Sequence, residues 1–376
     1  MAEKEEGADV PQEQKAGWGA FLKSLAHMTG DLSTMTAPPF ILSPVSLTEF
    51  PAYWCEHPGM FASISQGKTP QERMERVLQW FIGTLKGQYT TRNEKMGSEK
   101  KPLNPVLGEL FYGTWPDVNG RGETVLVVEQ VSHHPPITAY YIENKAAGVT
   151  LQGHSGQKTS FSGTAIHVKQ SGHALLKIKL QGGGEESFLI TLPKLRIEGI
   201  VWGSPYVELT DTSAIQSSTG FTAVIDYKGK GYFTGKQHSF KATIQHGSKT
   251  LQSYEGQWTG KSTIGSSKGP VFLDTSSPKE EVTVQPIENQ GEWESRRLWD
   301  KVARGIKTAN YDEAAKLKTA IENEQRQRRK DEAAAGKSWE LVRFTHVDSD
   351  PEYQNLASML HDKLTPVAED AYVYKG

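Results

Sequence analysis

The sequence predicts a mainly β protein with flanking helices, and two observations support this prediction. Between residues 104 and 275 the chain consists of short runs rich in Val, Ile, Thr and aromatic residues, separated by Gly-containing turns: TVLVVEQV, ITAYYI, VTLQG, ALLKIKL, SFLITL, FTAVIDY and YEGQW. No helical pattern interrupts these runs, so consecutive strands should pair as an antiparallel meander that needs closure to avoid exposed edges. We therefore expect a large, near-closed antiparallel β-barrel around an interior cavity, with a two-sheet sandwich as the alternative.

Residues 1–30 are predicted to form an acidic tail followed by an amphipathic helix. Trp18, Phe21, Leu22 and Leu25 recur at i, i+3, i+4 and i+7, which places them on one helical stripe. The opposite face has almost no acidic residue. Such a helix could dock on its own core, lie in a membrane interface, or act as a mobile lid that does each in turn.

Residues 31–103 are predicted to form a helical N-terminal subdomain. Ser46 and Glu49 have the spacing of a capping box, and Thr69, Pro70 and Glu72 open a second helix. The apolar residues of this second helix repeat with helical period and predict core packing: Met74, Val77, Leu78, Phe81, Ile82 and Leu85.

Residues 276–376 are predicted to form a C-terminal helical subdomain. A helical stripe contains Leu298, Trp299, Val302 and Ile306, after which Asn310 with Glu313 resembles the cap of a further helix. Acidic and basic residues alternate between positions 312 and 335, a pattern typical of a solvated helix face.

The composition excludes several classes of partner and environment. The 376 residues include 42 Lys and Arg against 44 Asp and Glu, so the formal net charge is -2 and bulk charge favours no nucleic acid. The single cysteine, Cys55, excludes an internal disulfide and a Cys-rich zinc site and favours the reducing cytosol. Because the N-terminus lacks a signal pattern and the stretch APPFILSPVSL is too short to span a bilayer, we expect only peripheral membrane contact.

The segment EQVSHHPP, residues 129–136, contains the most conspicuous candidate binding residues. His133 and His134 are neighbours at a strand end and should point to opposite faces, which argues against a metal site. Pro135 and Pro136 end the strand and leave the imidazoles at a rim, where they can donate to an anionic ligand. The alternative is that they cap the strand by bonding backbone carbonyls.

Two further segments carry cationic residues, and no part of the sequence matches a known catalytic motif. Residues 100–109, KKPLNPVLGE, form a proline-stiffened turn, and Lys318, Glu322 and Arg326 follow at i, i+4 and i+8 on one helix face, a pattern more typical of a surface ladder. The chain has no GxSxG elbow and no Walker loop, and nothing in the sequence activates Cys55. We expect no enzymatic activity, no metal and no cofactor. The competing hypothesis is a metal-dependent hydrolase built on His133 and His134.

EQVSHHPP and KPLNPVLGELF together resemble the oxysterol-binding protein family. The resemblance covers almost the whole chain, through IEGIVWGSP and GYFTGK to IENEQRQRRK, and is closest to short fungal members that consist of little besides the lipid-binding domain. It implies a hydrophobic tunnel in the barrel, a lid at the N-terminus, and transfer of a sterol or phosphatidylinositol 4-phosphate between membranes. Alternatives within the family are a sensor without net transport and transfer of another lipid such as phosphatidylserine.

The resemblance also implies individual residue roles. The phosphoinositide head group would be held by Lys101, the backbone at Leu103, His133, His134, Lys318 and Arg326, with Glu322 orienting the cations. The sterol tunnel would include Leu32, Trp54, Gln88, Tyr89, Gln170 and Ile200, and the lid Trp18, Phe21, Leu22 and Leu25. Where sterol-binding relatives place an Asn, this chain has His154 and Ser155. The expected protein is a cytoplasmic monomer that contacts Golgi or endoplasmic-reticulum membranes peripherally.

Overall fold

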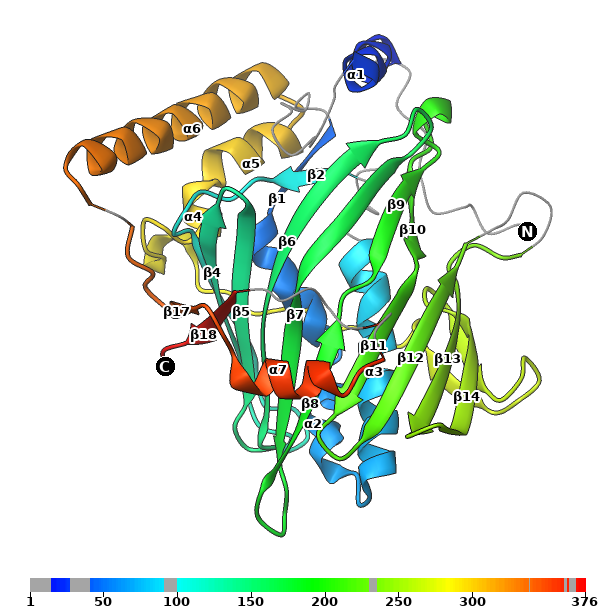
Figure 1. Ribbon diagram of the computed structural model, residues 1–376. Helices are drawn as coiled ribbons and strands as arrows, with labels where there is room; N and C mark the ends of the chain where they lie inside the picture. Colours follow the sequence, from blue (N-terminus) through cyan, green and yellow to red (C-terminus); the bar gives the residue numbers. More distant parts are fainter. Residues whose placement is uncertain are drawn as a thin grey trace.

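A curved antiparallel sheet of fourteen strands forms the body of the protein, as the computed structural model in Figure 1 shows. The structure describes residues 15–27, 41–90, 100–229, 235–337, 339–361, 364 and 370–376. The strands run along the sheet in the order β16-β15-β14-β13-β12-β11-β8-β7-β6-β5-β4-β3, with β9 paired to β7 and β10 paired to β9. The order is nearly that of the sequence, because short turns connect each strand to its neighbour.

The strands of this sheet are β3 (Leu110–Trp115), β4 (Thr124–His133), β5 (Pro136–Asn144), β6 (Val149–Phe161), β7 (Ile166–Lys179), β8 (Glu185–Thr191), β9 (Lys194–Glu198), β10 (Tyr206–Thr210), β11 (Thr212–Ser217), β12 (Phe221–Lys228), β13 (Ser239–His246), β14 (Lys249–Gln257), β15 (Lys261–Ile264) and β16 (Val271–Asp274). Each expected run lies in one of them. The prediction of a barrel-like sheet is confirmed, and the two-sheet sandwich is wrong.

The barrel is not strictly closed. No ladder joins β3 to β16 within the described residues. The β3 edge is instead covered by the chain that follows the sheet, because Thr114 and Thr283 exchange backbone hydrogen bonds of 2.9 and 2.8 Å and the Leu110 amide donates to the Trp293 carbonyl at 2.8 Å. This connection protects an edge that would otherwise present unpaired backbone groups.

Helices from the N-terminal part of the chain fill the inside of the curve (Figure 1). They are η4 (Leu47–Cys55), α2 (Pro58–Ser63), η5 (Ile64–Gln66) and α3 (Pro70–Tyr89). Thr69 caps α3 as predicted, accepting from the Glu72 amide at 3.1 Å, and the predicted apolar face is buried against the sheet. The Trp80 indole donates to the Trp54 carbonyl at 3.0 Å and ties α3 to η4. This part of the chain therefore shares one hydrophobic core with the sheet.

A second hydrophobic cluster lies at one end of the barrel. It joins α1 (Lys15–His27), β1 (Leu42–Ser46) and β2 (Lys101–Leu103), which pairs parallel to β1, with α4 (Ser295–Leu298), α5 (Asp300–Lys307) and α6 (Tyr311–Ala334). The predicted stripe is divided between α4 and α5, and its Trp299, Val302 and Ile306 are buried here. Asn310 precedes α6, but its side chain makes no capping bond. A further 3-10 turn, η8 (Ile287–Asn289), precedes α4.

The C-terminal segment covers the outer face of the sheet. It contains α7 (Pro351–Ser358) and a two-stranded sheet of β17 (Phe344–Val347) and β18 (Ala371–Tyr374), which the sequence analysis did not predict beside the helices of this part of the chain. The Glu129 carboxylate accepts from the Val342, Arg343 and Phe344 amides at 2.8, 2.7 and 3.2 Å. These bonds hold β17 against the sheet, and they explain why four successive residues of β4 are buried.

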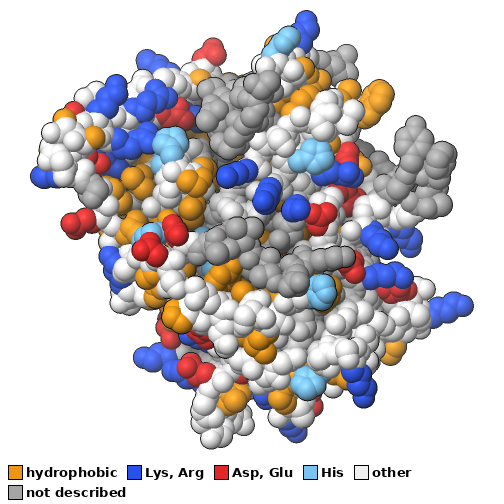
Figure 2. Space-filling model, viewed as in Figure 1, with side chains coloured by type: hydrophobic (Ala, Val, Ile, Leu, Met, Phe, Trp, Pro, Cys, Tyr) orange, Lys and Arg blue, Asp and Glu red, His pale blue; other side chains and the backbone are white. Residues whose placement is uncertain are grey.

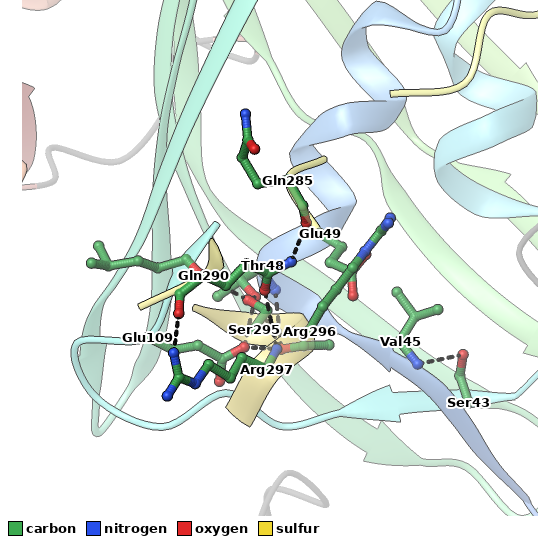
Figure 3. Close-up of polar contacts among 12 residues, drawn as sticks. Ser43, Val45, Thr48, Glu49, Glu109, Gln285, Gln290, Ser295, Arg296 and Arg297 are labelled. Atoms are coloured by element: carbon green, nitrogen blue, oxygen red, sulfur yellow. Dashed lines mark hydrogen bonds and ion pairs between the residues drawn. The ribbon is translucent and has the colours of Figure 1, made fainter. Parts of the chain in front are cut away.

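A buried carboxylate, Glu109, connects three parts of the chain. It accepts from Ser46 at 2.5 Å, Thr48 at 2.7 Å, the Val106 amide at 3.1 Å and the Trp299 indole at 2.9 Å. Figure 3 shows the surrounding contacts, which include a hydrogen bond between the Thr48 and Ser295 hydroxyls, with an oxygen–oxygen distance of 2.5 Å. Because every oxygen of this fully buried group has donors, the charge can be held inside the protein.

Glu109→Gln should destabilise the fold. The amide keeps the size of the side chain but removes the charge and places N–H groups against existing donors, so we expect a loss of about 2–4 kcal/mol in the free energy of unfolding. Urea denaturation measures this loss, with Glu288→Gln on the exposed turn η8 as the control. Equal stability of the two variants would contradict the role of Glu109.

Candidate functional site

A partly open cavity of about 290 Å³ lies between the inside of the sheet, η4, the end of α3 and helix α1. Its size falls near the lower end of small-molecule sites, roughly 300–1,000 Å³. The walls are largely apolar, with a few polar side chains from different elements. The lining includes Leu47, Phe50, Pro51, Tyr53, Tyr140, Ile166, Val168, Leu195, Ile197 and Val207.

Helix α1 covers the cavity. Trp18, Phe21 and Leu25 line it, while Leu22 is half-buried in the adjoining cluster of α1, β1 and α5. The Trp18 indole donates to the Ile200 carbonyl at 3.1 Å and ties the helix to the opposite rim. The helix is therefore docked over the cavity, an arrangement that both the docked-helix and the lid expectations require.

Five of the six residues assigned to the sterol tunnel line this cavity: Trp54, Gln88, Tyr89, Gln170 and Ile200. The sixth, Leu32, lies outside the described residues. The Gln170 amide donates to the Tyr89 hydroxyl at 2.8 Å and to the Pro193 carbonyl at 2.6 Å, while Gln88 donates to Thr84 at 2.8 Å. The cavity thus combines an apolar wall with oriented polar groups.

His154 and Ser155 point to opposite sides of β6. Ser155 lines the cavity. His154 is buried on the outer side, with its ring 4.9 Å from that of His173 and 5.5 Å from that of Tyr372. Burial lowers the pKa of His154 to about 4, so the ring is neutral near pH 7. Of these two residues, only Ser155 lines the cavity.

The start of β2 brings two lysines to the cavity, Lys101 in the strand and Lys100 just before it. Lys100 and Lys101 both line it, and Lys100 is largely buried, which lowers the pKa of its ammonium group. Leu103 is fully buried in the cluster beneath α5. The parallel pairing of β2 with β1 positions this segment at the end of the barrel near α1.

His133 and His134 were expected to point to opposite faces of the sheet. In the structure they lie side by side instead. Their ring centroids are 4.6 Å apart. The reason is that β4 ends at His133, so the alternation of a strand no longer applies to His134. Burial is the main cause that lowers the pKa of His133 to about 4, and the Arg329 charge and His134 lower it further. Within the described residues, the buried Nδ1 atom of His133 has no hydrogen-bond partner.

Helix α6 runs past this histidine pair. Lys318 and Glu322 form an ion pair, and Glu322 and Arg329 both act electrostatically on His133. Arg326 is exposed and donates to Asn323 at 2.7 Å. Arg326 was predicted for the head-group site and Arg329 was not, although residues 318, 322, 325 and 329 follow the helical period and Gln325 on that face is buried.

A stacked arginine fixes α6 in this position. The Arg328 guanidinium lies 4.2 Å from the Trp293 ring and 4.6 Å from the Trp339 ring, and it donates to the Leu107 carbonyl at 3.1 Å. Leu107 belongs to the turn between β2 and β3. The contact therefore holds α6, which carries Lys318 and Arg329, against the segment that carries Lys101.

Among the described residues, one cluster has the spacing of metal ligands: His346, Asp348 and Asp370. It is exposed beside the β17–β18 pair and does not include His133 or His134. Cys55 is fully buried, which raises the pKa of its thiol far above the usual range. None of the described helices is long and apolar enough to cross a membrane.

Comparison with known proteins agrees with this architecture. The family model for oxysterol-binding protein matches residues 20–305. Protein KES1 of Mycosarcoma maydis is 59% identical, with 99% of this chain and 98% of the relative covered, and protein kes1 of Schizosaccharomyces pombe is 46% identical, with 96% and 94% covered.

Solved structures resemble the fold at lower identity. The Osh1 ORD domain in complex with cholesterol is 21% identical with a TM-score of 0.76, covering 100% of this chain and 91% of that one. The Osh3 ORD of Saccharomyces cerevisiae in complex with PI(4)P is 22% identical with a TM-score of 0.68, covering 90% and 89%. On the extent of the family match and the identity to its relatives, the chain belongs to the oxysterol-binding protein family.

Proposed function

We propose that the protein is a non-enzymatic lipid-transfer protein that exchanges a sterol for phosphatidylinositol 4-phosphate between membranes. The observation that carries the proposal is the largely apolar cavity, which α1 covers and which Lys100 and Lys101 border on one side. The complexes of related ORD domains with ergosterol, cholesterol and PI(4)P support the same pairing of ligands.

The phosphoinositide head group would bind beside the histidine pair. Lys101, Lys318 and Arg326 supply positive charge, His133 and His134 supply ring N–H donors, and the backbone at Leu103 adds an amide. Glu322 orients Lys318 through their ion pair. Convergent charge-assisted bonds, each about 1.5–3 kcal/mol, can offset the dehydration of a phosphorylated inositol. Arg329 would contribute further positive charge next to His133.

A sterol would occupy the apolar interior beneath α1. Trp54 and Ile200 would contact its rings, and the Gln170 and Tyr89 pair, which is already hydrogen-bonded, would meet its single hydroxyl. Ser155 offers a second hydroxyl partner. Gln88 would complete this wall, together with Leu32.

One cavity serves both ligands in this proposal, so their binding is mutually exclusive. A volume of about 290 Å³ leaves no space for a sterol together with two acyl chains. A tenfold difference in phosphoinositide level between two membranes then supplies about 1.4 kcal/mol per exchange, which can sustain an opposing sterol gradient of at most tenfold. No nucleotide or other cofactor is required.

The remaining parts of the proposal concern the setting. The protein would act as a cytoplasmic monomer, contact Golgi or endoplasmic-reticulum membranes peripherally, and bind no nucleic acid. A sensor that sequesters the phosphoinositide without net transport needs the same cavity, as does a carrier of phosphatidylserine. Mass spectrometry of lipids that co-purify with the protein identifies the apolar ligand.

Replacement of His133 and His134 by Ala should weaken phosphoinositide extraction strongly and leave sterol extraction intact. Two donors disappear at the head-group site, while the apolar cavity is unchanged. We expect a loss of more than about tenfold in phosphoinositide binding, since about 1.4 kcal/mol already gives that factor. Extraction of each lipid from liposomes is the measurement. Equal loss of both lipids with a lowered melting temperature would instead make the histidines structural.

Lys101→Ala and Arg326→Ala should remove the acceleration of sterol transfer by phosphoinositide. Fluorescent sterol should move faster to acceptor liposomes that contain phosphatidylinositol 4-phosphate, and each variant should retain only the basal rate. Lys316→Ala, an exposed lysine on the same helix, is the matched control. The exchange mechanism is wrong if saturating phosphoinositide leaves the sterol in place, with one equivalent of each lipid bound.

Trp18→Phe should make the protein release its ligand faster. The variant keeps an aromatic ring over the cavity but loses the bond to the Ile200 carbonyl, so we expect a rise in the release rate of about two- to tenfold. Deletion of residues 1–30 should have a larger effect and leave the barrel folded. Stopped-flow release of a fluorescent sterol measures both, with Lys23→Ala on the exposed face of α1 as the control. Unchanged release in both variants would exclude a lid.

A further inference from the structure

The connection between β9 and β10 carries an exposed hydrophobic tip. It is a 3-10 turn, η7 (Ile200–Trp202), in which the Trp202 side chain is 88% exposed and Val201 is 45% exposed. Trp202 is the most exposed large hydrophobic residue in the described part of the chain. An isolated exposed Val needs no explanation, but a Trp with almost no protein contact forgoes the burial that usually stabilises it.

The backbone holds this tip in a defined shape. Gly199 and Gly203 flank it in the left-handed region, with φ of 71° and 75°. A Cβ atom at Gly199 would lie 2.2 Å from the Ser204 carbonyl oxygen, so only glycine fits. The Trp202 and Ser204 amides both donate to the Gly199 carbonyl at 3.1 Å. The exposure of Trp202 is therefore a consequence of an ordered turn.

The tip lies directly beside the cavity and its cover. Ile200 is buried and lines the cavity, and its carbonyl accepts the hydrogen bond from the Trp18 indole of α1. Figure 2 shows hydrophobic side chains at the end of the β9–β10 hairpin, next to those of α1. One turn therefore contributes a wall residue, the attachment of α1 and an exposed Trp.

We propose that Val201 and Trp202 insert into the interface of a lipid bilayer and seat the mouth of the cavity on it. This inference rests on the proposed function, because a lipid that enters the cavity must leave a bilayer at its mouth. Trp suits the head-group region, since its ring is apolar and its N–H can bond to lipid oxygens. At the base of the hairpin Arg196 and Glu198 pair at 2.6 Å, so these two residues add no net charge beside the tip.

A protein partner fits this tip less well than a bilayer. A stable interface buries about 800 Å² on each side, whereas the tip offers two side chains, of which a Trp contributes about 250 Å² at most. A convex tip also has no concave surface to receive a partner. A bilayer interface needs neither shape complementarity nor a large area, because apolar insertion alone supplies the binding free energy.

A fluorescent label can test the insertion site directly. The only native cysteine, Cys55, is fully buried, so Val201→Cys creates a single reactive thiol and keeps Trp202. Val271→Cys, at a valine that is 61% exposed on β16, is the matched control. With an environment-sensitive dye and small vesicles of neutral phosphatidylcholine, we expect a blue shift from position 201 and none from position 271. No shift at position 201, or equal shifts at both positions, overturns the proposal.

Removal of the ring tests the contribution of the tip to transfer. Trp202→Ala should weaken binding to the same vesicles about tenfold and slow sterol transfer in proportion, while Trp202→Phe should retain most of both. Affinity for sterol delivered from cyclodextrin should not change, because Trp202 does not line the cavity. Normal vesicle binding by Trp202→Ala overturns the proposal, as does self-association of the native protein that this variant loses.

The two proposals fail in distinguishable ways. If the protein binds and exchanges lipid but the label at position 201 does not respond to vesicles, the insertion site is wrong and the proposed function stands. If the protein takes up neither sterol from cyclodextrin nor phosphoinositide from vesicles, the proposed function is wrong. The insertion of Val201 and Trp202 then loses its basis as well.

Discussion

The buried Glu109 carboxylate is the contact on which the arrangement of the mouth depends. A lone charge inside a protein is costly, and this one is stabilised only if Ser46, Thr48 and the Trp299 indole reach it together. Those donors come from the start of η4 and from the junction of α4 with α5, while Glu109 itself follows β2. The requirement for complete hydrogen bonding thus brings three distant segments to one end of the barrel.

That junction holds one part of the candidate site, and two further contacts hold the other parts. Lys101 and Glu109 lie at the two ends of the segment that contains β2 and the turn after it. Helix α6 follows α5 and is fixed by Arg328, which lies between two Trp rings. The histidine pair ends β4, whose Glu129 is held by the C-terminal segment. Each part of the site is therefore attached to a different buried polar contact, so a change in one contact should affect one group of ligand partners.

Sequence patterns predicted the helices and strands that depend mainly on interactions between residues close in sequence. The alternating β-rich runs and the capped helix that begins at Thr69 depend on neighbours in sequence, and both are present as expected. The relation between His133 and His134 was predicted wrongly, because the end of a strand is set by its partner strand. The β17 and β18 pair was missed for a similar reason, since Phe344 and Tyr372 are stabilised by contact with β4 and β5.

By itself, the sequence determined the class of fold, the apolar stripe of α1 and, through EQVSHHPP, the family. These features can be predicted from the spacing of residues, because hydrophobic periodicity and turn residues determine local structure over a few positions. The tertiary structure decided that Ser155 and not His154 faces the cavity, that Arg329 acts on His133, and that Trp202 is exposed beside the mouth. Each of these outcomes depends on which segments pack together across the fold, and packing between distant segments is not encoded in the spacing of neighbours.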